Sequence, residues 1–456
     1  MAILTLRDRL YVDYPAEAVD ALKMLATFER VGRLRPNQKR VVKYYLPQND
    51  GTRLALPRGL APKVQKLLPN APVRDERLTV RPVTLGFRWE LRDYQEAAVD
   101  AIVRRGGGVI VSPPGSGKTV MLLSVADRLH QPVLFLVHTL RLVDQTASEA
   151  RKALTLPRGG LGIIADGRTQ IGTHFTVATI QTLAKKPRLL RQLTQRFGTL
   201  IIDEVHHSPS QTAARVISAM PAKYRVGASA TVERDDGLGP MVHALVGPPV
   251  VIPRRILRER GVIVDPIIHL VRTHWEPPDD IPFHEAEELR SMDPRRNVLI
   301  AKLVGMARSR GQRVLVLVER EKHAMLLAQI LTKAGIPAHP VYGKLATPLQ
   351  DQRFKWMEQG KAVVVATKLA NEGLDWPALD CLVLATPGRS PTVLEQRTGR
   401  IARTAEGKTF ALVYDLVDDS PMYMDQTQAR IAKYQEMGYR IRRFRWPTKP
   451  DATVPS

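Results

Sequence analysis

One stretch of the chain, Val109-Ile-Val-Ser-Pro-Pro-Gly115-Ser-Gly117-Lys118-Thr119, constrains its fold more than any other. A short apolar run, a loop with two glycines and a Lys-Thr pair that opens a helix together form a cradle for phosphate groups. The glycines let backbone N–H groups turn inward, and the start of the helix adds its partial positive charge. The stretch therefore predicts a strand, a phosphate-binding loop and a helix, in that order.

The residues of this loop have predicted roles. Lys118 is expected to reach the β- and γ-phosphates of a nucleotide, and the hydroxyl of Thr119 is expected to hold Mg²⁺. The first glycine of the GxxxxGK[ST] pattern is replaced by Ser112, and a glycine-rich turn between a strand and a helix also arises for packing reasons alone. The other predicted nucleotide contacts in the loop are Pro114, Gly115, Ser116 and Gly117.

The segment Leu91-Arg92-Asp-Tyr-Gln95 precedes a predicted helix over residues 96–104 and lies just upstream of the phosphate loop. A glutamine amide pairs bidentately with the edge of an adenine, as it does on DNA, and an arginine stacks on a base. Arg92 and Gln95 are therefore predicted to select ATP over GTP.

A second decisive stretch, Thr199-Leu-Ile-Ile-Asp203-Glu204-Val-His206-His207, delivers two carboxylates to the end of an apolar strand. Asp203 is expected to order Mg²⁺ through its water shell, and Glu204 to orient and deprotonate the attacking water. The histidine pair does not predict a zinc site, because adjacent side chains point apart and no second pair of ligands has suitable spacing.

Other predicted strands also end in polar groups. The continuous apolar run 133–137 is typical of a strand buried on both faces, and Thr139 and Arg141 follow it. The run 175–179 repeats the pattern and ends in Thr179. Hydroxyls and amides at such strand ends are expected to hold a nucleic-acid backbone, with simple capping of the strand ends as the alternative.

After a proline-rich stretch at residues 247–253, the alternation of helix and strand patterns restarts and predicts a second α/β unit. This unit has no phosphate loop, but residues 396–403 carry arginines three positions apart, which share one face if the segment is helical. Arginine stabilises the charge of a γ-phosphate in the transition state, an effect of about 10³–10⁵ in rate where such a finger operates.

The chain is strongly basic, with 68 Lys and Arg against 45 Asp and Glu and a net charge of +23. A field of this sign attracts polyanions and accelerates their capture. A merely basic, solvated surface is the alternative. A nucleotide-driven motor on nucleic acid explains both the charge and the phosphate loop.

Residues 1–86 carry no catalytic motif and predict a small α/β accessory domain. Helical spacing occurs over residues 15–25 and 60–68, and Val41–Leu46 reads as a strand. We expect this domain to dock on duplex or branched DNA; the alternative is a basic domain without a groove of its own. Its basic cluster is Arg30, Arg33, Arg35, Lys39 and Arg40.

Several classes of protein are disfavoured. No apolar run approaches the roughly 18–20 residues that span a bilayer, and Arg7 interrupts the apolar N-terminus too early for a secretory signal. With Cys381 as its one cysteine, the chain can form no intrachain disulfide. The predicted location is the cytoplasm of a bacterial, archaeal or phage-infected cell.

Taken in order, these stretches resemble the motifs of superfamily 2 helicases and translocases over roughly residues 88–415. Residues 91–95 are similar to the adenine-reading motif, and residues 112–119 to motif I. Asp203-Glu-Val-His206 resembles the DExH form of motif II. The other matches are Ser229-Ala-Thr231 to motif III, Glu372-Gly-Leu-Asp375 to motif V and Gln396–Arg403 to motif VI.

Within the superfamily, Leu91–Gln95 and Ser229–Gly237 most resemble the XPB-like and phage UvsW-like DNA helicases. Leu56-Pro-Arg-Gly59 and Tyr414–Asp419 also resemble phage branch-migration helicases. The resemblance implies an α/β fold of two tandem RecA-like domains, parallel sheets flanked by helices, that clamp ATP between them beside the small N-terminal α/β domain. The expected domains are residues 1–86, 87–250, 251–420 and 421–456, the last a helix over Met424–Met437 and a basic tail.

The resemblance also implies roles for individual residues, with ATP and Mg²⁺ as cofactors. Arg400 and Arg403 would reach from the second domain to the phosphates bound by Lys118. The remaining implied roles are ATP contact for Gly373 and Asp375, coupling of the two sites for His206, Ser229, Thr231 and Gln396, and backbone contact with the tracking strand for Thr139, Arg141, Thr179 and Thr367.

The predicted function is an ATP-dependent DNA helicase or translocase that unwinds or remodels forked or branched DNA in repair, recombination or branch migration. An RNA helicase is an alternative, because such a core contacts phosphates. A second alternative is a duplex translocase subunit of a restriction or remodelling complex. A third, a nucleotide-gated binding module with negligible turnover, is disfavoured by the intact Lys118, Asp203, Glu204 and Arg403.

Overall fold

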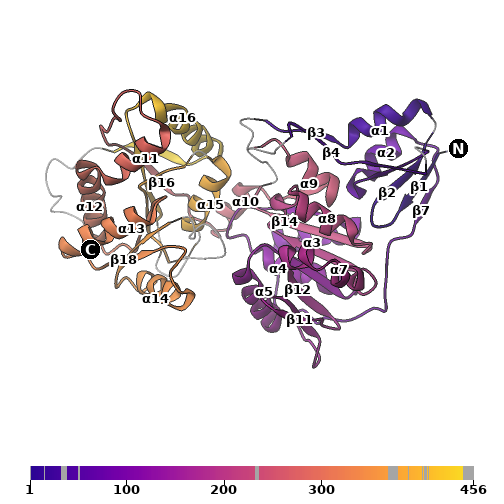
Figure 1. The fold of residues 1–456 in the computed structure, drawn as a ribbon. Helices are drawn as coiled ribbons and strands as arrows, with labels where there is room; N and C mark the ends of the chain where they lie inside the picture. The colour runs from indigo at the N-terminus through magenta and orange to yellow at the C-terminus, as the bar shows by residue number, and fades with distance from the viewer. Residues whose placement is uncertain are drawn as a thin grey trace. The chain divides into compact units, whose positions relative to one another are not determined.

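The computed structural model describes residues 2–14, 16–31, 39–49, 52–231, 236–367, 378–388, 390–402, 404, 408 and 410–444. The chain folds into two compact units, Met1–Ile256 and Leu257–Ser456, and Figure 1 labels their elements. Helix α10 (Arg254–Glu259) contains the boundary between them. In the described part of the chain, no helix has both the length and the apolar composition that crossing a membrane requires.

The large sheet of the first unit has the strand order β11-β10-β12-β9-β13-β14-β8-β15. Neighbouring strands run parallel except β10 and β11. The central strands are buried along their whole length, as parallel strands covered by helices on both faces are. The strands are β8 (Gly107–Val111), β9 (Val133–Val137), β10 (Leu161–Ala165), β11 (Arg168–Gln170), β12 (Phe175–Thr179), β13 (Thr199–Asp203), β14 (Tyr224–Ser229) and β15 (Pro249–Val251).

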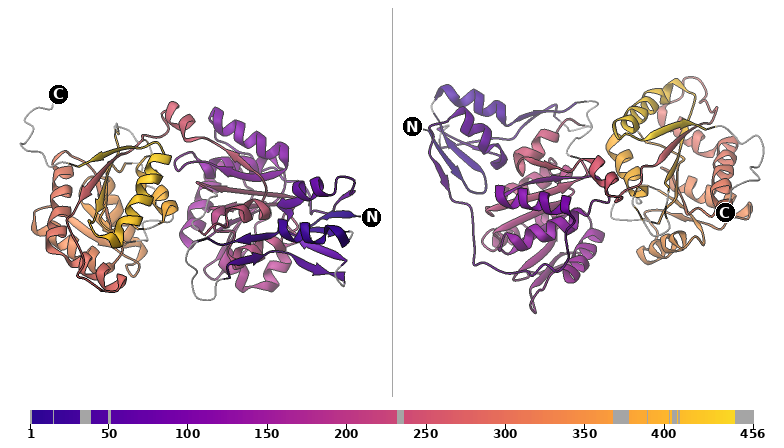
Figure 2. Two further views of the ribbon diagram at one scale, coloured as in Figure 1. Left: turned by 90° about the horizontal axis from the view of Figure 1, so that it is seen from above. Right: turned by 180° about the vertical axis from the view of Figure 1, so that it is seen from behind.

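Helices connect these strands and cover the sheet (Figures 1 and 2). Their bounds are α3 (Asp93–Arg105), α4 (Lys118–Arg128), α5 (Leu140–Ala153), α6 (Ile180–Lys185), α7 (Pro187–Leu193), α8 (Gln211–Ala219) and α9 (Gly239–Leu245).

The N-terminal part of the first unit forms a small mixed sheet of order β5-β6-β2-β1-β7, with β3 and β4 paired as a separate ribbon. Helices α1 (Val19–Leu25) and α2 (Ala61–Leu67) accompany it. The strands are β1 (Ile3–Leu6), β2 (Leu10–Asp13), β3 (Thr27–Glu29), β4 (Val41–Lys43), β5 (Leu46–Gln48), β6 (Arg53–Leu56) and β7 (Val73–Asp75).

This small sheet docks on the large one through two buried arginines. Arg58 donates to the carbonyl oxygens of Ala222 at 2.7 Å and Lys223 at 3.2 Å. Arg225, at the start of β14, donates to the carbonyl of Asp8 at 3.2 Å. Apolar residues of both sheets also belong to one continuous core. The N-terminal sheet is therefore built into the first unit.

One predicted strand is wrong. Val41–Leu46 was expected to be a single strand, but the chain forms β4 and then β5, which belong to different sheets. The backbone N–H of Tyr44 donates to the carbonyl of Ala26, at the base of the β3–β4 ribbon. After this bond the chain turns to pair with β6. Contacts with residues far away in the sequence decide the break, and a local strand pattern does not contain them.

The second unit contains a sheet of order β18-β19-β17-β20-β21-β16-β22, in which neighbouring strands run parallel. The strands are β16 (Ile267–Arg272), β17 (Val314–Leu317), β18 (Ala338–Val341), β19 (Val363–Ala366), β20 (Cys381–Leu384), β21 (Leu412–Val417) and β22 (Arg440–Arg443). The helices are α11 (Phe283–Met292), α12 (Pro294–Ser309), α13 (Glu321–Lys333), α14 (Thr347–Glu358), α15 (Pro391–Ile401) and α16 (Pro421–Glu436).

Both faces of this second sheet are apolar. Along β17, Val314 and Val316 pack in the core formed with α12 and α13, whereas Leu315 and Leu317 pack in the core formed with α14, α15 and α16. Every residue of the strand is therefore buried, which explains why its sequence is a continuous apolar run.

The predicted fold class is confirmed: each unit contains a mainly parallel sheet flanked by helices, beside a small N-terminal α/β sheet. The four domain ranges remain a prediction. In the structure, the small sheet of β1, β2, β5, β6 and β7 belongs to the first unit, and the predicted tail contributes α16 and β22 to the second. The predicted helix over Met424–Met437 is present and begins three residues earlier.

Candidate active site

The loop between β8 and α4 has the backbone shape that the sequence predicts. Gly115 and Gly117 both have positive φ angles, 88° and 82°, which favour glycine. A Cβ atom on Gly117 would also collide with Nε2 of Gln95. Nζ of Lys118 lies 3.4 Å from the carbonyl oxygen of Ser112, and the hydroxyls of Ser112 and Ser116 are bonded to each other. The lysine thus lies over the loop at the start of α4.

Gln95 braces this loop. Its Oε1 accepts from the backbone N–H of Arg92 at 3.0 Å, and its Nε2 donates to the carbonyl of Ser116 at 2.8 Å. The hydroxyl of Tyr94 donates to the same carbonyl at 3.1 Å. A glutamine amide has two donors and two acceptor lone pairs, so Gln95 keeps capacity for a further bond. Its contact with adenine remains a prediction; its bond to the phosphate loop and the role of Tyr94 were not predicted.

The two predicted carboxylates lie at the carboxyl end of β13. Asp203 is 8% exposed, and its Oδ1 accepts from the backbone N–H of Glu204 at 2.9 Å. Glu204 has a φ of 48°, a left-handed conformation that is unusual for a residue with a side chain and is often retained at functional sites.

Glu204 is linked to the neighbouring strand through His206. Nδ1 of His206 lies 3.3 Å from Oε2 of Glu204 and 2.9 Å from the hydroxyl of Ser229, at the end of β14. The carbonyl of Ser229 in turn accepts from the backbone N–H of Ser112, at 3.0 Å. The predicted coupling residues His206 and Ser229 therefore connect the carboxylate to the phosphate loop. Thr231 lies directly after β14.

The two carboxyl groups are electrostatically unlike. Burial and the negative charge of Glu204 raise the pKa of Asp203 to about 7, and Lys118 only partly offsets this. For Glu204, burial is outweighed by the bond to His206 and the charge of Lys118, which hold its pKa below the ordinary value. A buried carboxyl that disfavours its own charge gains most from a nearby cation. Together with the Thr119 hydroxyl, Asp203 supplies the oxygen ligands that Mg²⁺ prefers.

The predicted strand-end residues of the first unit cap helices. The hydroxyl of Thr139 accepts from the backbone N–H of Leu142 at 3.3 Å, and that of Thr179 accepts from the N–H of Thr182 at 3.3 Å. Capping, the alternative that the sequence left open, is thus confirmed for both, while nucleic-acid contact remains a prediction. Arg141 lies in the first turn of α5.

Histidine 138, which sequence reasoning did not assign, lies beside the carboxylates. Its ring is 4.4 Å from that of His207, which is 4.0 Å from that of His206. Burial, with a smaller effect of His206, lowers the pKa of His138 to about 4, so that it is neutral at pH 7. His138 directly follows the apolar strand β9, and Asp203 is the last residue of the apolar strand β13; this polar group at a strand end is the signal that could have indicated His138.

In the second unit, α15 carries Gln396 and Arg400. Arg397 on the same helix is buried and lies 3.6 Å from Glu319. Thr367 follows β19, is 7% exposed, and its backbone N–H donates to the carbonyl of Val341. The predicted site residues Gly373, Asp375 and Arg403 lie outside the described residues.

Two family models match the chain. The model described as "Type III restriction enzyme, res subunit" matches residues 88–234, and the model described as "Helicase conserved C-terminal domain" matches residues 295–405. The first match contains the phosphate loop and the carboxylates of β13. The second contains Thr367 and α15.

Curated relatives carry similar names. "Probable helicase D10" of Escherichia phage T5 is 29% identical over 343 residues, which are 73% of this chain and 72% of that protein. "DNA 3'-5' helicase XPB" of Kineococcus radiotolerans is 26% identical over 367 residues, which are 78% of this chain and 64% of that protein.

Two solved structures have a similar fold. The ATP-dependent Type ISP restriction-modification enzyme LlaBIII bound to DNA aligns with a TM-score of 0.59 at 16% identity, over 77% of this chain and 30% of that one. The Saccharomyces cerevisiae Dbp5 bound to RNA and ADP BeF3 aligns with a TM-score of 0.55 at 18% identity, over 78% of this chain and 94% of that one. Motif order and family matches together show that the chain belongs to the superfamily 2 helicases and is an ATP-dependent enzyme.

Proposed function

We propose that the protein is an ATP-driven DNA helicase or translocase of the XPB-like and UvsW-like kind, which acts on forked or branched DNA in repair, recombination or branch migration. The observation that carries the proposal is the arrangement at the end of β13. There Glu204, which has a left-handed backbone conformation, is linked through His206 to Ser229. We assign to these bonds the coupling of ATP hydrolysis to strand movement.

The proposed chemistry follows from the first unit's residues. Lys118 and the N–H groups of the glycine loop bind the phosphates of ATP. Thr119 and Asp203 would hold Mg²⁺, which neutralises charge on the β- and γ-phosphate oxygens when it is bound. Glu204, ionised at pH 7, takes the proton of the attacking water.

We propose that Arg400 and Arg403 supply the positive charge that stabilises the γ-phosphate. Further contacts with ATP are assigned to Arg92, Gln95, Gly373 and Asp375. Arginine at this place stabilises the charge that develops in the transition state. What supports the assignment is the position of these residues in the stretches that resemble the adenine-reading motif, motif V and motif VI.

The relative from Kineococcus is named as a DNA helicase, which favours DNA as the polymer. The net charge of +23 suits any nucleic acid and does not choose between DNA and RNA. Likeness of fold does not decide between the polymers, because the fold is shared with one protein bound to DNA and another bound to RNA. The proposed backbone contacts are Thr139, Arg141, Thr179 and Thr367.

The basic residues of the β3–β4 ribbon, which is separate from the N-terminal sheet, are proposed to hold the duplex arms. Lys39, Arg40 and Lys43 are exposed on and beside β4. Deletion of the N-terminal sheet would uncover the core that it shares with the large sheet. Variants that remove only the charges therefore test this role. We expect a variant with glutamine at all three positions to retain basal ATPase and to bind forked DNA with a flatter salt dependence, by about 0.9 in the slope of log K against log[salt] for each lost contact. An unchanged slope would exclude this surface from the duplex contact.

A specific observation favours one other function. The family model that matches residues 88–234 is described for a restriction enzyme subunit, which suits a translocase that moves along duplex DNA without unwinding it. Steady-state ATPase without nucleic acid and with single-stranded DNA, duplex DNA, forked DNA or RNA separates the functions. We expect the greatest stimulation by forked DNA. Stimulation by duplex DNA without strand separation would support the translocase, and stimulation by RNA alone would overturn the DNA assignment.

A further inference from the structure

A hollow of about 330 Å³ lies in the second unit, between the first halves of β16 and β21 and the C-terminal end of α12. Ile267 and Leu412, at the amino ends of these parallel strands, are among the residues that line it. The strand-end residue Thr367, proposed to contact nucleic acid, follows the carboxyl end of β19 instead. The hollow is thus separate from the site at the carboxyl ends of the strands.

Aromatic rings form its walls. His269 and Tyr414 are direct neighbours across β16 and β21, with ring centroids 5.7 Å apart and nearly perpendicular planes. Phe444 completes the cluster at 5.5 Å from Tyr414 and 5.8 Å from His269. Phe410, which is 42% exposed, also lines the hollow. Walls of this kind suit a flat, polarizable ring system, because stacked and edge-on contacts with aromatic side chains are favourable.

One residue that lines the hollow, Gln312, has a buried polar atom without a partner among the described residues. Gln312 is 5% exposed, and its Oε1 has no hydrogen-bond donor among the described residues. Nδ1 of His269 is also buried and has no hydrogen-bond partner among the described residues. An unsatisfied buried acceptor is unfavourable, and a ligand that brings an N–H group into the hollow would satisfy it. The lining is therefore mostly apolar and includes a buried acceptor that needs a hydrogen-bond donor, as ligand-binding pockets do.

Positive charge borders the aromatic wall. Arg310, which is exposed, lines the hollow, and the exposed Arg442 of β22 is the direct neighbour of His269 in the sheet. Burial first, and then these two arginines, lower the pKa of His269, so that its ring is neutral at pH 7. The cations at the rim suit an anionic group attached to the flat ring.

We propose that this hollow binds a nucleobase that carries a phosphate, with the base against His269, Tyr414 and Phe444, an N–H of the base donating to Gln312, and the phosphate near Arg310. Every base has an N–H group on its pairing edge. A volume of about 330 Å³ is at the lower end of the range for ligand pockets, which suits a single base. The base comes from a free mononucleotide or from a nucleic-acid strand, and the strand source rests on the proposed function.

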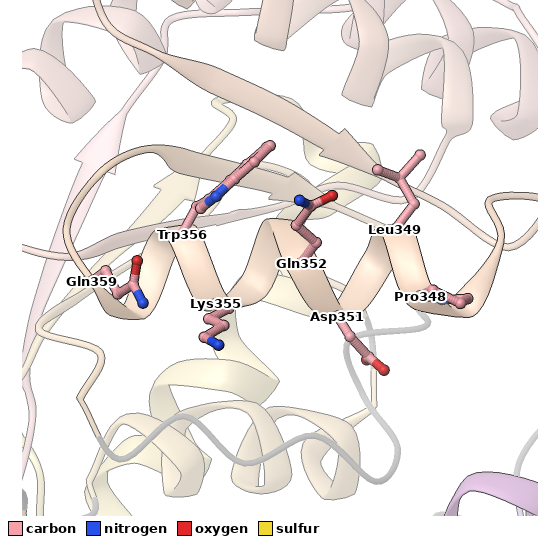
Figure 3. A pocket seen from close by; sticks show the side chains of 7 residues that line it. All are labelled: Pro348, Leu349, Asp351, Gln352, Lys355, Trp356 and Gln359. Carbon is pink, nitrogen blue, oxygen red and sulfur yellow. The ribbon is translucent and has the colours of Figure 1, made fainter.

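A second hollow in the same unit provides a matched control. It follows α14 and is larger, about 720 Å³, and Figure 3 shows Trp356, Gln352 and Leu349 on one side of the helix and Lys355 and Asp351 on the other. None of the seven side chains that line it, all of them described, has a buried polar atom without a partner. This second hollow therefore offers an aromatic surface without a buried polar atom that lacks a partner.

The test measures binding directly, in a Lys118→Ala background that weakens the ATP site. Equilibrium dialysis with cytidine 5′-monophosphate and anisotropy with a fluorescent single-stranded oligodeoxynucleotide are compared for Gln312→Met and for the control Trp356→Ala. Gln312→Met keeps the length of the side chain and removes the unpartnered oxygen, so the fold is expected to persist; a thermal melt confirms this. Tyr414→Ala serves as a second variant, expected to weaken binding on the order of 10-fold by loss of stacking.

A loss of about 10-fold in mononucleotide affinity in Gln312→Met, with no loss in Trp356→Ala, would support the site and a free nucleotide as its source. The same pattern for the oligonucleotide alone would support a base of a strand. Equal binding of both probes by the parent protein and both variants of the hollow would overturn the proposal. This result is distinct from failure of the proposed function, which would appear as ATPase of the wild-type chain that no nucleic acid stimulates.

Discussion

Two buried aspartates, one in each unit, occupy comparable places and have opposite environments. Asp203 ends β13 and is 8% exposed; Asp418 directly follows β21 and is 5% exposed. Asp203 accepts one hydrogen bond from the adjacent backbone, at 2.9 Å. Asp418 accepts from Arg296 at 2.9 Å, Arg290 at 3.0 Å and Thr273 at 2.6 Å.

The pKa values of the two groups express this difference. Burial and Glu204 raise the pKa of Asp203. For Asp418, burial is outweighed by the charges of Arg296 and Arg290, which lower its pKa. Burial at the end of a parallel strand therefore does not by itself mark a functional carboxylate. For Asp203, the proposed catalytic one, Lys118 offsets the effect of burial only in part, so that the carboxylate can accept a cation from solution.

The largest expected effect separates the two groups by activity. Asp203→Asn should lower ATPase by at least about 100-fold, because charge stabilisation worth several kcal/mol depends on the cation it is proposed to hold. Asp418→Asn, assayed at a temperature where it is folded, should retain ATPase within about 3-fold. Steady-state phosphate release measures both. Equal losses of ATPase activity in the two variants would contradict the different roles assigned to the two aspartates.

The second effect separates them by stability. Asp418→Asn should lower the free energy of unfolding by about 3–5 kcal/mol, because it leaves buried arginines without their countercharge. Asp419→Asn is the matched control: Asp419 pairs with Arg272, whose side chain is 67% exposed, and the expected change is below about 1 kcal/mol. Asp203→Asn should not reduce stability. Denaturant unfolding of the three variants makes the measurement, and a stable Asp418→Asn would contradict the assigned structural role.

The smallest expected effect is in the pH dependence of unfolding. The lowered pKa of Asp418 contributes stability that is present above its unfolded pKa of about 3.9 and is lost as pH falls through the folded pKa. The raised pKa of Asp203 has the opposite sign: its contribution is present below about pH 4 and is lost as pH rises toward about 7. Asp203→Asn should therefore flatten the slope between about pH 4 and 7, and Asp418→Asn the slope below about pH 4. If neither substitution changes the slope of the unfolding free energy against pH, the pKa directions assigned to both aspartates are contradicted.

The sequence predicted the parts of the molecule that depend on local pattern. The phosphate loop requires two glycines at set positions, and the positive φ angles of Gly115 and Gly117 agree with this requirement. The buried parallel strands follow from continuous apolar runs, and Asp203 and Glu204 lie at the strand end where the pattern placed them.

What the sequence could not predict depends on contacts over long separations. Nothing near Gln95 indicates that its amide bonds to Ser116, twenty-one positions later. Asp418 gives no local sign that Arg296 and Arg290, more than a hundred residues earlier, neutralise it. Likewise, Arg58 belongs to a stretch noted for its resemblance to phage helicases, but its guanidinium binds carbonyl oxygens of the large sheet.

Glu204 is proposed to activate water for ATP hydrolysis, and the substitution Glu204→Gln tests this role. Its amide retains the size of the side chain and cannot accept the proton. Fluorescent ATP binding and steady-state phosphate release are measured on the same preparation with forked DNA. We expect that the variant retains ATP binding and that its turnover falls below a tenth of the wild-type value. Turnover above a tenth, with ATP bound normally, would contradict it.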